Sequence, residues 1–386
     1  MLEKALVGNK KYWMFVFFLL VIIGLGFLTY LCQLSQGLGI TGMSRDVSWG
    51  LYIAQFTFLV GVAASAVMVV LPYYLHDYKA FGKLTVLGEF LAIASVIMCM
   101  LFIFVDMGQP FRAFNMILHP TPGSVMFWDM VSLGGYLLLN MLIGWTCLEA
   151  ERKSVPPPKW IKPFIYLSIP WAVSIHTVTA FLYCGIGGRS FWFTAIMAPR
   201  FLSSAFSAGP ALLIIFALII RRISHFKPGY EPIQKLAQIV TYAICINVFF
   251  VLLEIFTVFY SAIPEHMHHF KYLFVGLHGH TGLVPWMWAS TVLCLFAIVL
   301  LVNPKTRKKE HLLVIACVAV FIGTWIDKGM GLVVTGFIPN PFDTVTEYMP
   351  TYREVLIALG VYGIGALIIT VLYKIVLAIR DREIAN

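Results

Sequence analysis

Long apolar runs separated by short polar segments dominate this chain of 386 residues. A helix needs about 20 mainly apolar residues to cross the hydrocarbon core of a bilayer, and ten runs meet that length. The predicted spans are about 12–34, 50–75, 84–105, 127–148, 164–185, 201–220, 236–260, 284–302, 311–327 and 353–379. The first run is too long for the apolar region of a signal peptide, and no small-residue cleavage site follows it, so we expect it to remain as a membrane helix.

The composition leads to the same class of protein. Hydrophobic residues make up 60% of the chain and charged residues 12%, whereas soluble domains average about 45–50% and about 25%. Disorder is excluded too, because 31 Phe, 17 Tyr and 10 Trp give far too much apolar surface. We predict an all-α polytopic integral membrane protein in which residues 1–386 form a single transmembrane domain with no separate soluble domain.

The 27 Lys and Arg residues are divided unequally between the two sides of the predicted spans. Twenty, Lys227 among them, lie at the chain ends or in short connections on one side, which we take as cytoplasmic because basic loops stay on that side. Both termini are therefore predicted to be cytoplasmic, in the inner membrane. The other side holds Arg45, Arg112, Arg189, Arg200, Lys271, Lys328 and Arg353. The net charge of +9 thus follows from topology and anionic lipid, and gives no support for nucleic-acid binding.

The three longest connections, 106–126, 261–283 and 329–352, are predicted to face outward. They carry Pro, Gly, aromatic and His residues, and long varied loops are where binding surfaces usually lie. Five histidines in the second connection have no acidic or thiol ligands at a recognised spacing, so we predict a docking surface or polar loop there and no metal site. These are His266, His268, His269, His278 and His280.

Ionisable side chains within the spans cost a few kcal/mol each at the bilayer centre, so each one is a functional candidate. In the fourth span Asp129 is followed at +3, +7 and +11 by Ser132, Tyr136 and Asn140. At about 100° per residue these four share one helix face. An acid favoured by the helix dipole is the simpler interpretation of Asp129, but it does not account for the polar stripe.

Three further ionisable residues lie within spans. His176 and Glu254 fall in the outer halves of the fifth and seventh spans, and Glu89 follows the cytoplasmic start of the third. A carboxylate and an imidazole at similar depth suit a site that handles a carrier of two protons. Structural hydrogen bonding of His176 or Glu254, and a lipid-headgroup role for Glu89, remain open alternatives.

The sequence offers no site for a bound redox group. Its seven cysteines occur singly, without a C-x-x-C pair, and only one histidine lies deep in a span, whereas a transmembrane haem needs two. We therefore expect neither haem nor an iron–sulfur cluster in this chain.

Several segments resemble a known family of membrane subunits. They are Asp106-Met-Gly-Gln-Pro-Phe-Arg112, His119-Pro, Ser124-Val-Met-Phe-Trp-Asp129, Ser174-Ile-His176-Thr-Val-Thr-Ala-Phe and Trp325-Ile-Asp-Lys-Gly-Met-Gly-Leu. The chain resembles the NrfD/PsrC-like subunits of polysulfide and nitrite reductases over nearly its whole length. Ten spans and these segments make it most similar to the DsrP type of the sulfite-reduction-linked DsrMKJOP complex.

The resemblance implies two four-helix bundles with peripheral helices. It also implies menaquinone or menaquinol as an exchangeable substrate near the outer face, and an iron–sulfur partner subunit there. A complex of the DsrMKJOP kind adds a cytochrome b, a multihaem cytochrome c and a cytoplasmic iron–sulfur subunit.

The resemblance also suggests residue roles. Asp129 would accept the proton, His176 would orient the quinone, and Tyr136 with Ser132 would complete the pocket. Arg112 or Asp106 would gate the pocket or hold the partner. Glu89, Glu254 and Asn140 would form the proton path.

Two other functions remain open. An ion- or proton-coupled secondary transporter, or a proton-conducting subunit, would use Glu89 and Glu254 as coupling carboxylates. Broken helices in matching positions of the two halves would favour it, and no such pair is visible. A pure membrane anchor would leave the buried carboxylates without a purpose.

Overall fold

The structure, a computed structural model, describes residues 2–224 and 228–385, so Lys227 lies outside the described residues. Ten helices of the described part are long and apolar enough to cross a membrane. No extended strand occurs in the described ranges, where Leu277 and His280 form an isolated bridge. The predicted all-α membrane protein with ten spans is confirmed.

The helix bounds lie within six residues of the predicted ones, except in the ninth span. The spans are α1 (Lys10–Gln36), α2 (Leu51–Val62) continuing into α3 (Val67–Leu75), α4 (Gly82–Asp106), α6 (Val125–Arg152), α7 (Lys162–Cys184), α8 (Met197–Ile223), α9 (Tyr230–Ser261), α11 (Val284–Val302), α13 (Glu310–Trp325) continuing into α14 (Leu332–Thr335), and α15 (Tyr352–Ala385).

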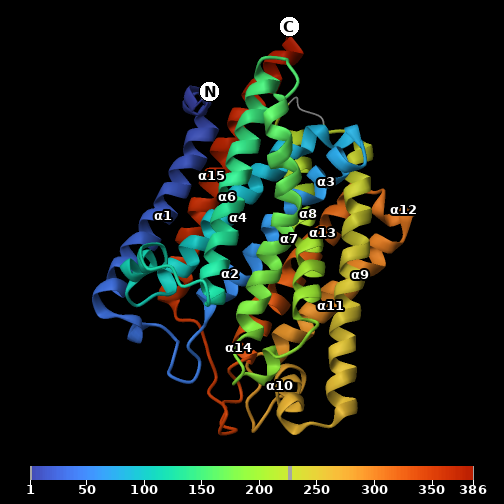
Figure 1. The fold of residues 1–386 in the computed structure, drawn as a ribbon. Coiled ribbons are helices and arrows are strands. Elements are labelled where there is room, and N and C mark those ends of the chain that lie inside the picture. Colours follow the sequence, from blue (N-terminus) through green and yellow to red (C-terminus); the bar gives the residue numbers. More distant parts are fainter. Residues whose placement is uncertain (1, 225–227, 386) are drawn as a thin grey trace.

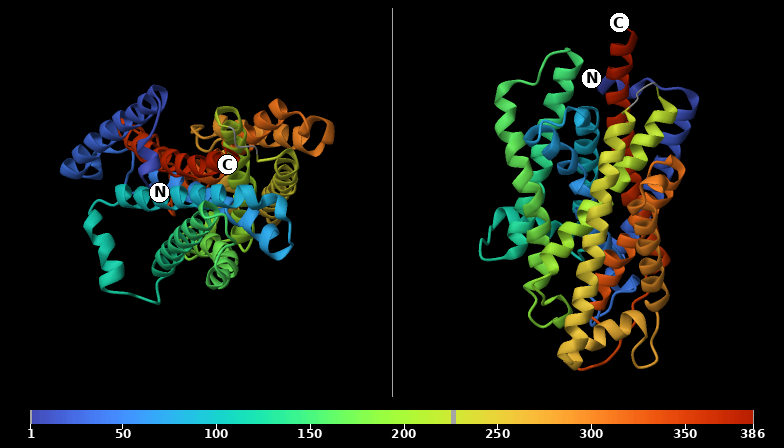
Figure 2. Two further views of the ribbon diagram at one scale, coloured as in Figure 1. Left: turned by 90° about the horizontal axis from the view of Figure 1, so that it is seen from above. Right: turned by 90° about the vertical axis from the view of Figure 1, so that its right-hand side faces the viewer.

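Eight of the spans form two groups of four. The first bundle contains α2 with α3, α4, α6 and α7, and the second contains α8, α9, α11 and α13 with α14. Contacts of α8 with α2 and α7 join the bundles. The peripheral helices α1 and α15 pack together, and α15 covers α4 (Figures 1 and 2).

Small residues set the closest helix contact of the peripheral pair. A Cβ atom on Gly26 of α1 would lie only 2.6 Å from the Cα of Gly360 on α15. Lipid tails are as apolar as the helices, so close backbone approach and van der Waals contact hold such helices together. Two facing glycines allow that approach.

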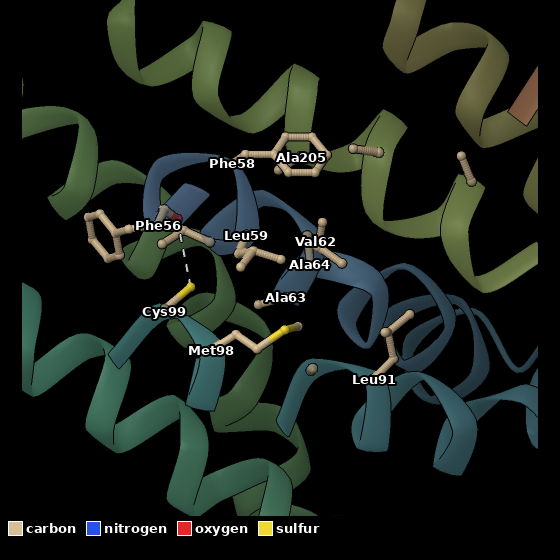
Figure 3. Packing of buried hydrophobic residues seen from close by; sticks show 14 of the residues in the cluster. Phe56, Phe58, Leu59, Val62, Ala63, Ala64, Leu91, Met98, Cys99 and Ala205 are labelled. Atoms are coloured by element: carbon tan, nitrogen blue, oxygen red, sulfur yellow. Dashed lines mark hydrogen bonds between the residues drawn. The ribbon is translucent and has the colours of Figure 1, made fainter. Parts of the chain in front are cut away.

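The interior around α2 is mostly apolar and tightly packed. Phe56 and Leu59 of α2 lie on the side of Met98 and Cys99 of α4, whereas Phe58 points toward Ala205 of α8 (Figure 3). The thiol of Cys99 donates to the carbonyl of Phe56, with 3.7 Å between sulfur and oxygen. This cysteine therefore acts as a small buried packing residue, as its isolated position in the sequence suggests.

Both chain ends lie at the same end of the molecule, with the short basic connections (Figure 1). At the opposite end, the 261–283 connection contains a further helix, α10 (Pro264–Phe274). The ninth span was predicted wrongly, because it does not end at residue 327. A π-helical turn, Ile326–Gly331, carries it on to Thr335.

Arg200 and Lys328 were also misplaced by the loop-charge argument. Both are buried within helices, with 8% and 4% of their surfaces exposed. The sequence of the segment Asp327-Lys-Gly-Met-Gly predicts a polar turn. It stays helical because its charged side chains find partners inside the protein.

Candidate functional site

The polar stripe of α6 is buried along its whole length. Asp129, Ser132, Tyr136 and Asn140 are each at most 5% exposed. The hydroxyl of Thr179 on α7 donates to Asp129 Oδ1 at 2.6 Å. The stripe thus faces the interior of the first bundle, and Asp129 accepts a hydrogen bond there from a neutral donor.

Tyr136 is held by a break in the neighbouring helix. Its hydroxyl donates to the carbonyl of Ala63 at 3.3 Å. That carbonyl lies in the 3₁₀ turn Ala63–Ser65, which separates α2 from α3. One turn further along α6, the side-chain amide of Asn140 donates to the carbonyl of Tyr136 at 2.8 Å. Backbone carbonyl groups therefore hold the two residues of the stripe that are farther from Asp129, Tyr136 and Asn140.

His176 lies one helical turn before Thr179 on α7 and is completely buried. Neither of its ring nitrogens has a hydrogen-bond partner among the described residues. The ring of Phe206 on α8 meets it edge-on, with 6.4 Å between centroids. Buried polar groups are nearly always hydrogen-bonded, so this imidazole has unused capacity to donate one hydrogen bond and accept another.

Lys328, which the sequence did not single out as a site residue, reaches from the π-helical turn into the interface between the bundles. Its Nζ atom lies 4.2 Å from the centre of the Phe201 ring and 3.4 Å from the Phe201 carbonyl oxygen. It lies within electrostatic range of His176 and Cys99, and Cys99 in turn of Asp129. π-helical turns are frequent at functional sites. In the sequence, the mostly apolar residues 332–335 after this lysine indicated that the helix continues past it and buries it.

Glu254 is paired in the second bundle. Arg200 donates to Glu254 Oε2 at 2.6 Å and to Asp327 Oδ1 at 2.7 Å. All three residues are less than 10% exposed. One guanidinium therefore holds two carboxylates from α9 and the π-helical turn, and this ion triad lies apart from Asp129.

Cavities adjoin the triad on two sides. One of about 140 Å³ is lined by Glu254 and by outer residues that include Ser190 and His266. Another of about 350 Å³ lies between α9 and α11, and Asn247 and Asp327 line it. The triad is thus reachable from the outer connections as well as from the apolar flank. The quinone-pocket candidates on α6 and α7 line neither cavity.

Glu89 lies beside the end of the α6 stripe that is farther from Asp129. It is 2% exposed, and its Oε2 atom has no hydrogen-bond partner among the described residues. A Cβ atom on Gly144 of α6 would be 3.1 Å from that oxygen. Gly144 follows Asn140 by one helical turn, so the stripe leads from Asp129, in the half of the molecule away from the chain ends, to Glu89 in the half near them (Figure 1).

The two residues proposed to gate the pocket lie in different environments. Asp106 ends α4 within electrostatic range of Tyr183, and its Oδ1 atom is buried with no partner among the described residues. Arg112 is exposed on the 3₁₀ turn Pro110–Phe114, in a connection that extends to the side of the first bundle (Figure 2). Of the two, Asp106 is the one that lies near the α7 residues.

The outer histidines differ in their surroundings. His269 is 4% exposed, its Nδ1 atom lies 2.8 Å from the carbonyl oxygen of Ile338, and its Nε2 atom lies 3.0 Å from Ser190 Oγ. Burial lowers the pKa of His269 to about 4, so the ring is neutral, donates from Nδ1 and accepts at Nε2. His268 and His278 lie beside Asp343. In the described ranges no three His, Cys, Asp or Glu side chains are grouped to hold a metal ion.

Comparison with known proteins identifies relatives over most of the chain. The profile of the family described as "Polysulphide reductase, NrfD" matches residues 39–337, which span both bundles. A Halobacterium salinarum protein named as the membrane subunit of a dimethyl sulfoxide reductase is 27% identical, over 92% of this chain and 89% of its own length.

Two further relatives are named for menaquinone chemistry. The integral membrane subunit of an Hdr-like menaquinol oxidoreductase from Archaeoglobus fulgidus is 24% identical, over 78% of this chain and 74% of the relative. The integral membrane subunit of a menaquinone reductase from Nitratidesulfovibrio vulgaris is 21% identical, over 95% and 91%.

Proposed function

Because this chain belongs to the polysulphide reductase NrfD family, whose members are membrane subunits of quinone-linked reductase complexes, we propose a specific role for it. It exchanges two electrons and two protons between menaquinone or menaquinol and an iron–sulfur partner subunit on the outer face. The observation that carries the proposal is His176, a buried imidazole with both nitrogens unpartnered among the described residues, one turn from the Thr179 that donates to Asp129.

The chemistry assigned to these residues follows from their hydrogen-bonding capacity. Asp129 accepts a proton from a quinol hydroxyl, because a carboxylate bonded to one neutral donor keeps further acceptor positions free. His176 orients the head group through a ring nitrogen. Lys328 lies within electrostatic range of this imidazole and donates a hydrogen bond to the oxygen on which negative charge develops. Asp129 takes up the two protons one after the other, the two electrons leave to the iron–sulfur centre of the partner, and the reverse steps reduce quinone.

We assign the proton route to the α6 stripe. From Asp129, protons pass along Ser132, Tyr136 and Asn140 to Glu89, whose Oε2 atom faces Gly144 and has no hydrogen-bond partner in the described part of the chain. Glu254 provides a separate proton route to the outer face, through the cavity that it lines. The transporter alternative depends on Glu254 and Glu89, and the cavities beside the ion triad are what favours it.

The partner and the location belong to the same proposal. The protein lies in the inner membrane with cytoplasmic termini, and the outer connections receive an iron–sulfur subunit of a DsrMKJOP-like complex. That complex also contains the cytochrome b, the multihaem cytochrome c and the cytoplasmic iron–sulfur subunit. The link to sulfite reduction rests on the number of spans and on the sequence segments that resemble the DsrP type.

The decisive experiment uses Asp129→Asn in the assembled complex. This change keeps the size of the side chain and removes the proton-accepting charge, so quinol-dependent reduction of the partner's iron–sulfur centres falls by about 10²–10⁴-fold while assembly survives. Glu254→Gln is the comparison variant. The transporter alternative predicts a larger loss in Glu254→Gln than in Asp129→Asn, and near-normal rates in Asp129→Asn contradict the assignment.

Two simpler measurements accompany it. The separated chain is expected to show no Soret band and no stoichiometric iron, and stoichiometric haem overturns the cofactor-free assignment. Reporter fusions after Lys162 and Lys309 are expected to report cytoplasm, and fusions within 261–283 to report the outside. A cytoplasmic signal from 261–283 reverses the proposed orientation.

A further inference from the structure

A cavity of about 500 Å³ lies on the other side of α2 from Asp129. It is formed by the start of α2, the outer end of α11, the π-helical turn and the first turns of α15. Its walls are mostly apolar, with the rings of Trp286, Trp325, Tyr348 and Tyr362 among them. The volume falls in the range of small-molecule sites, about 300–1,000 Å³.

The orientation of Gln55, the amide in this cavity, is fixed by its neighbours. Its Oε1 atom accepts from Trp325 Nε1 at 2.6 Å and from the hydroxyl of Tyr362 at 2.6 Å. An indole nitrogen donates and does not accept, so the atom facing Trp325 is the oxygen. The amide nitrogen therefore points elsewhere.

That nitrogen is left without an acceptor. Gln55 is 1% exposed, and its Nε2 atom is buried with no hydrogen-bond partner among the described residues. Of the other polar side chains in the cavity wall, Tyr348 donates to Glu354 at 2.6 Å, and Glu347 accepts from the backbone of Gly282 at 2.9 Å and lies 3.7 Å from His280. A buried amide with two unused N–H groups costs free energy unless an acceptor fills the site.

The cavity is distinct from the proposed quinone site. Gln55 and Thr57 are two residues apart on α2, and at about 100° per residue they point to nearly opposite sides. Thr57 is hydrogen-bonded to Tyr183 of α7, on the side of Asp129. Gln55 instead faces α15 and the π-helical turn.

The cavity opens toward the lipid. Trp286 is 54% exposed and Leu359 is 49% exposed, and both lie in the outer turns of membrane-spanning helices. An occupant therefore enters from the bilayer and presents an acceptor atom to a neutral donor in an apolar, aromatic environment.

We propose that this cavity binds an apolar bilayer molecule through a carbonyl oxygen, which accepts the hydrogen bond of Gln55 Nε2. Two bilayer molecules carry that group: a naphthoquinone and a glycerophospholipid, through its acyl ester. The site does not depend on the redox role assigned to Asp129.

Gln33 provides a matched control. It is also a buried glutamine, 2% exposed, but both ends are paired: its amide nitrogen donates to the Val105 carbonyl at 2.7 Å and its oxygen accepts from Tyr52 at 2.7 Å. Gln33→Leu and Gln55→Leu each remove a buried amide and leave its hydrogen-bond partners unpaired, so both lower the stability of the fold. Of the two, Gln55→Leu is the one that removes the unpartnered donor.

The test is native mass spectrometry of the delipidated full chain, titrated in parallel with menaquinone-4 and with palmitoyl-oleoyl phosphatidylethanolamine. For one of the probes, Gln55→Leu is expected to weaken binding about tenfold relative to Gln33→Leu, and that probe identifies the source of the carbonyl. Equal binding of both probes in Gln55→Leu and Gln33→Leu overturns the proposal.

Discussion

The two bundles bury ionisable groups in opposite ways. In the first bundle Asp129 accepts a hydrogen bond from the neutral Thr179 hydroxyl, and His176 has no partner at either nitrogen among the described residues. In the second, Arg200 holds Glu254 and Asp327 at ion-pair distance. Unused hydrogen-bonding capacity inside a protein is costly unless a ligand or proton fills it. The first bundle is thus prepared for an exchangeable partner, and the second compensates its own charges.

The largest effect is expected from breaking the paired region. Arg200→Leu leaves Glu254 and Asp327 buried without their cation, and breaking a buried ion pair in this way costs about 3–5 kcal/mol. The free energy of unfolding of the purified chain, measured by denaturant titration in mild detergent, is expected to fall by that amount. Asp129→Asn, in the first bundle, is the control and changes it far less. Equal stability of Arg200→Leu and the unaltered chain would falsify the structural role of the triad.

His269 and His176 extend the comparison to two buried histidines, of which His269 has partners at both nitrogens. Because the pKa of His269 is lowered to about 4, its contribution to stability is complete above the ordinary histidine pKa of about 6.5 and is lost as the pH falls toward 4. At about 1.4 kcal/mol per pKa unit, the loss totals about 3 kcal/mol. Unfolding free energies measured between pH 7.5 and 4 test this. His269→Gln is expected to flatten the dependence, and an unchanged slope in that variant contradicts the assignment.

His176→Ala tests the unpartnered histidine. The variant loses no hydrogen bond of the ring within the described protein, so assembly is expected to survive. The affinity for quinone is expected to fall about tenfold, which corresponds to one hydrogen bond of about 1.4 kcal/mol. Equilibrium binding of menaquinone-4 to the variant and to Ser290→Ala, a change in the second bundle, gives the measurement. A loss of affinity shared by both variants reduces His176 to a general packing role.

Glu89→Gln is expected to give the smallest effect. If Glu89 supplies only the inner proton path, quinol turnover falls by less than about tenfold, below the range expected for loss of a general base. Steady-state turnover in proteoliposomes at several pH values measures it. A loss as large as that of Asp129→Asn moves the primary proton acceptor to the inner half.

Much of the fold was predictable from local pattern. Bilayer thickness sets the length of each apolar run, and the basic connections indicated that the two ends share one side. The stripe of Asp129, Ser132, Tyr136 and Asn140 followed from the helical period, since all four lie on a single helix. The ninth span was predicted too short, because the charges of Asp327 and Lys328 suggest a loop when their partners are unknown.

The sequence by itself determined ten helices, their approximate ends, and which residues share a helix face. Only the tertiary structure decided which buried groups are paired. Arg200 meets Glu254 across 54 residues and Asp327 across 127, and Gln55 meets Trp325 across 270. Helical periodicity relates residues a few turns apart, whereas these partners depend on how separate helices pack. A buried charge or amide is stable only where that packing supplies a partner, so its role emerges with the fold.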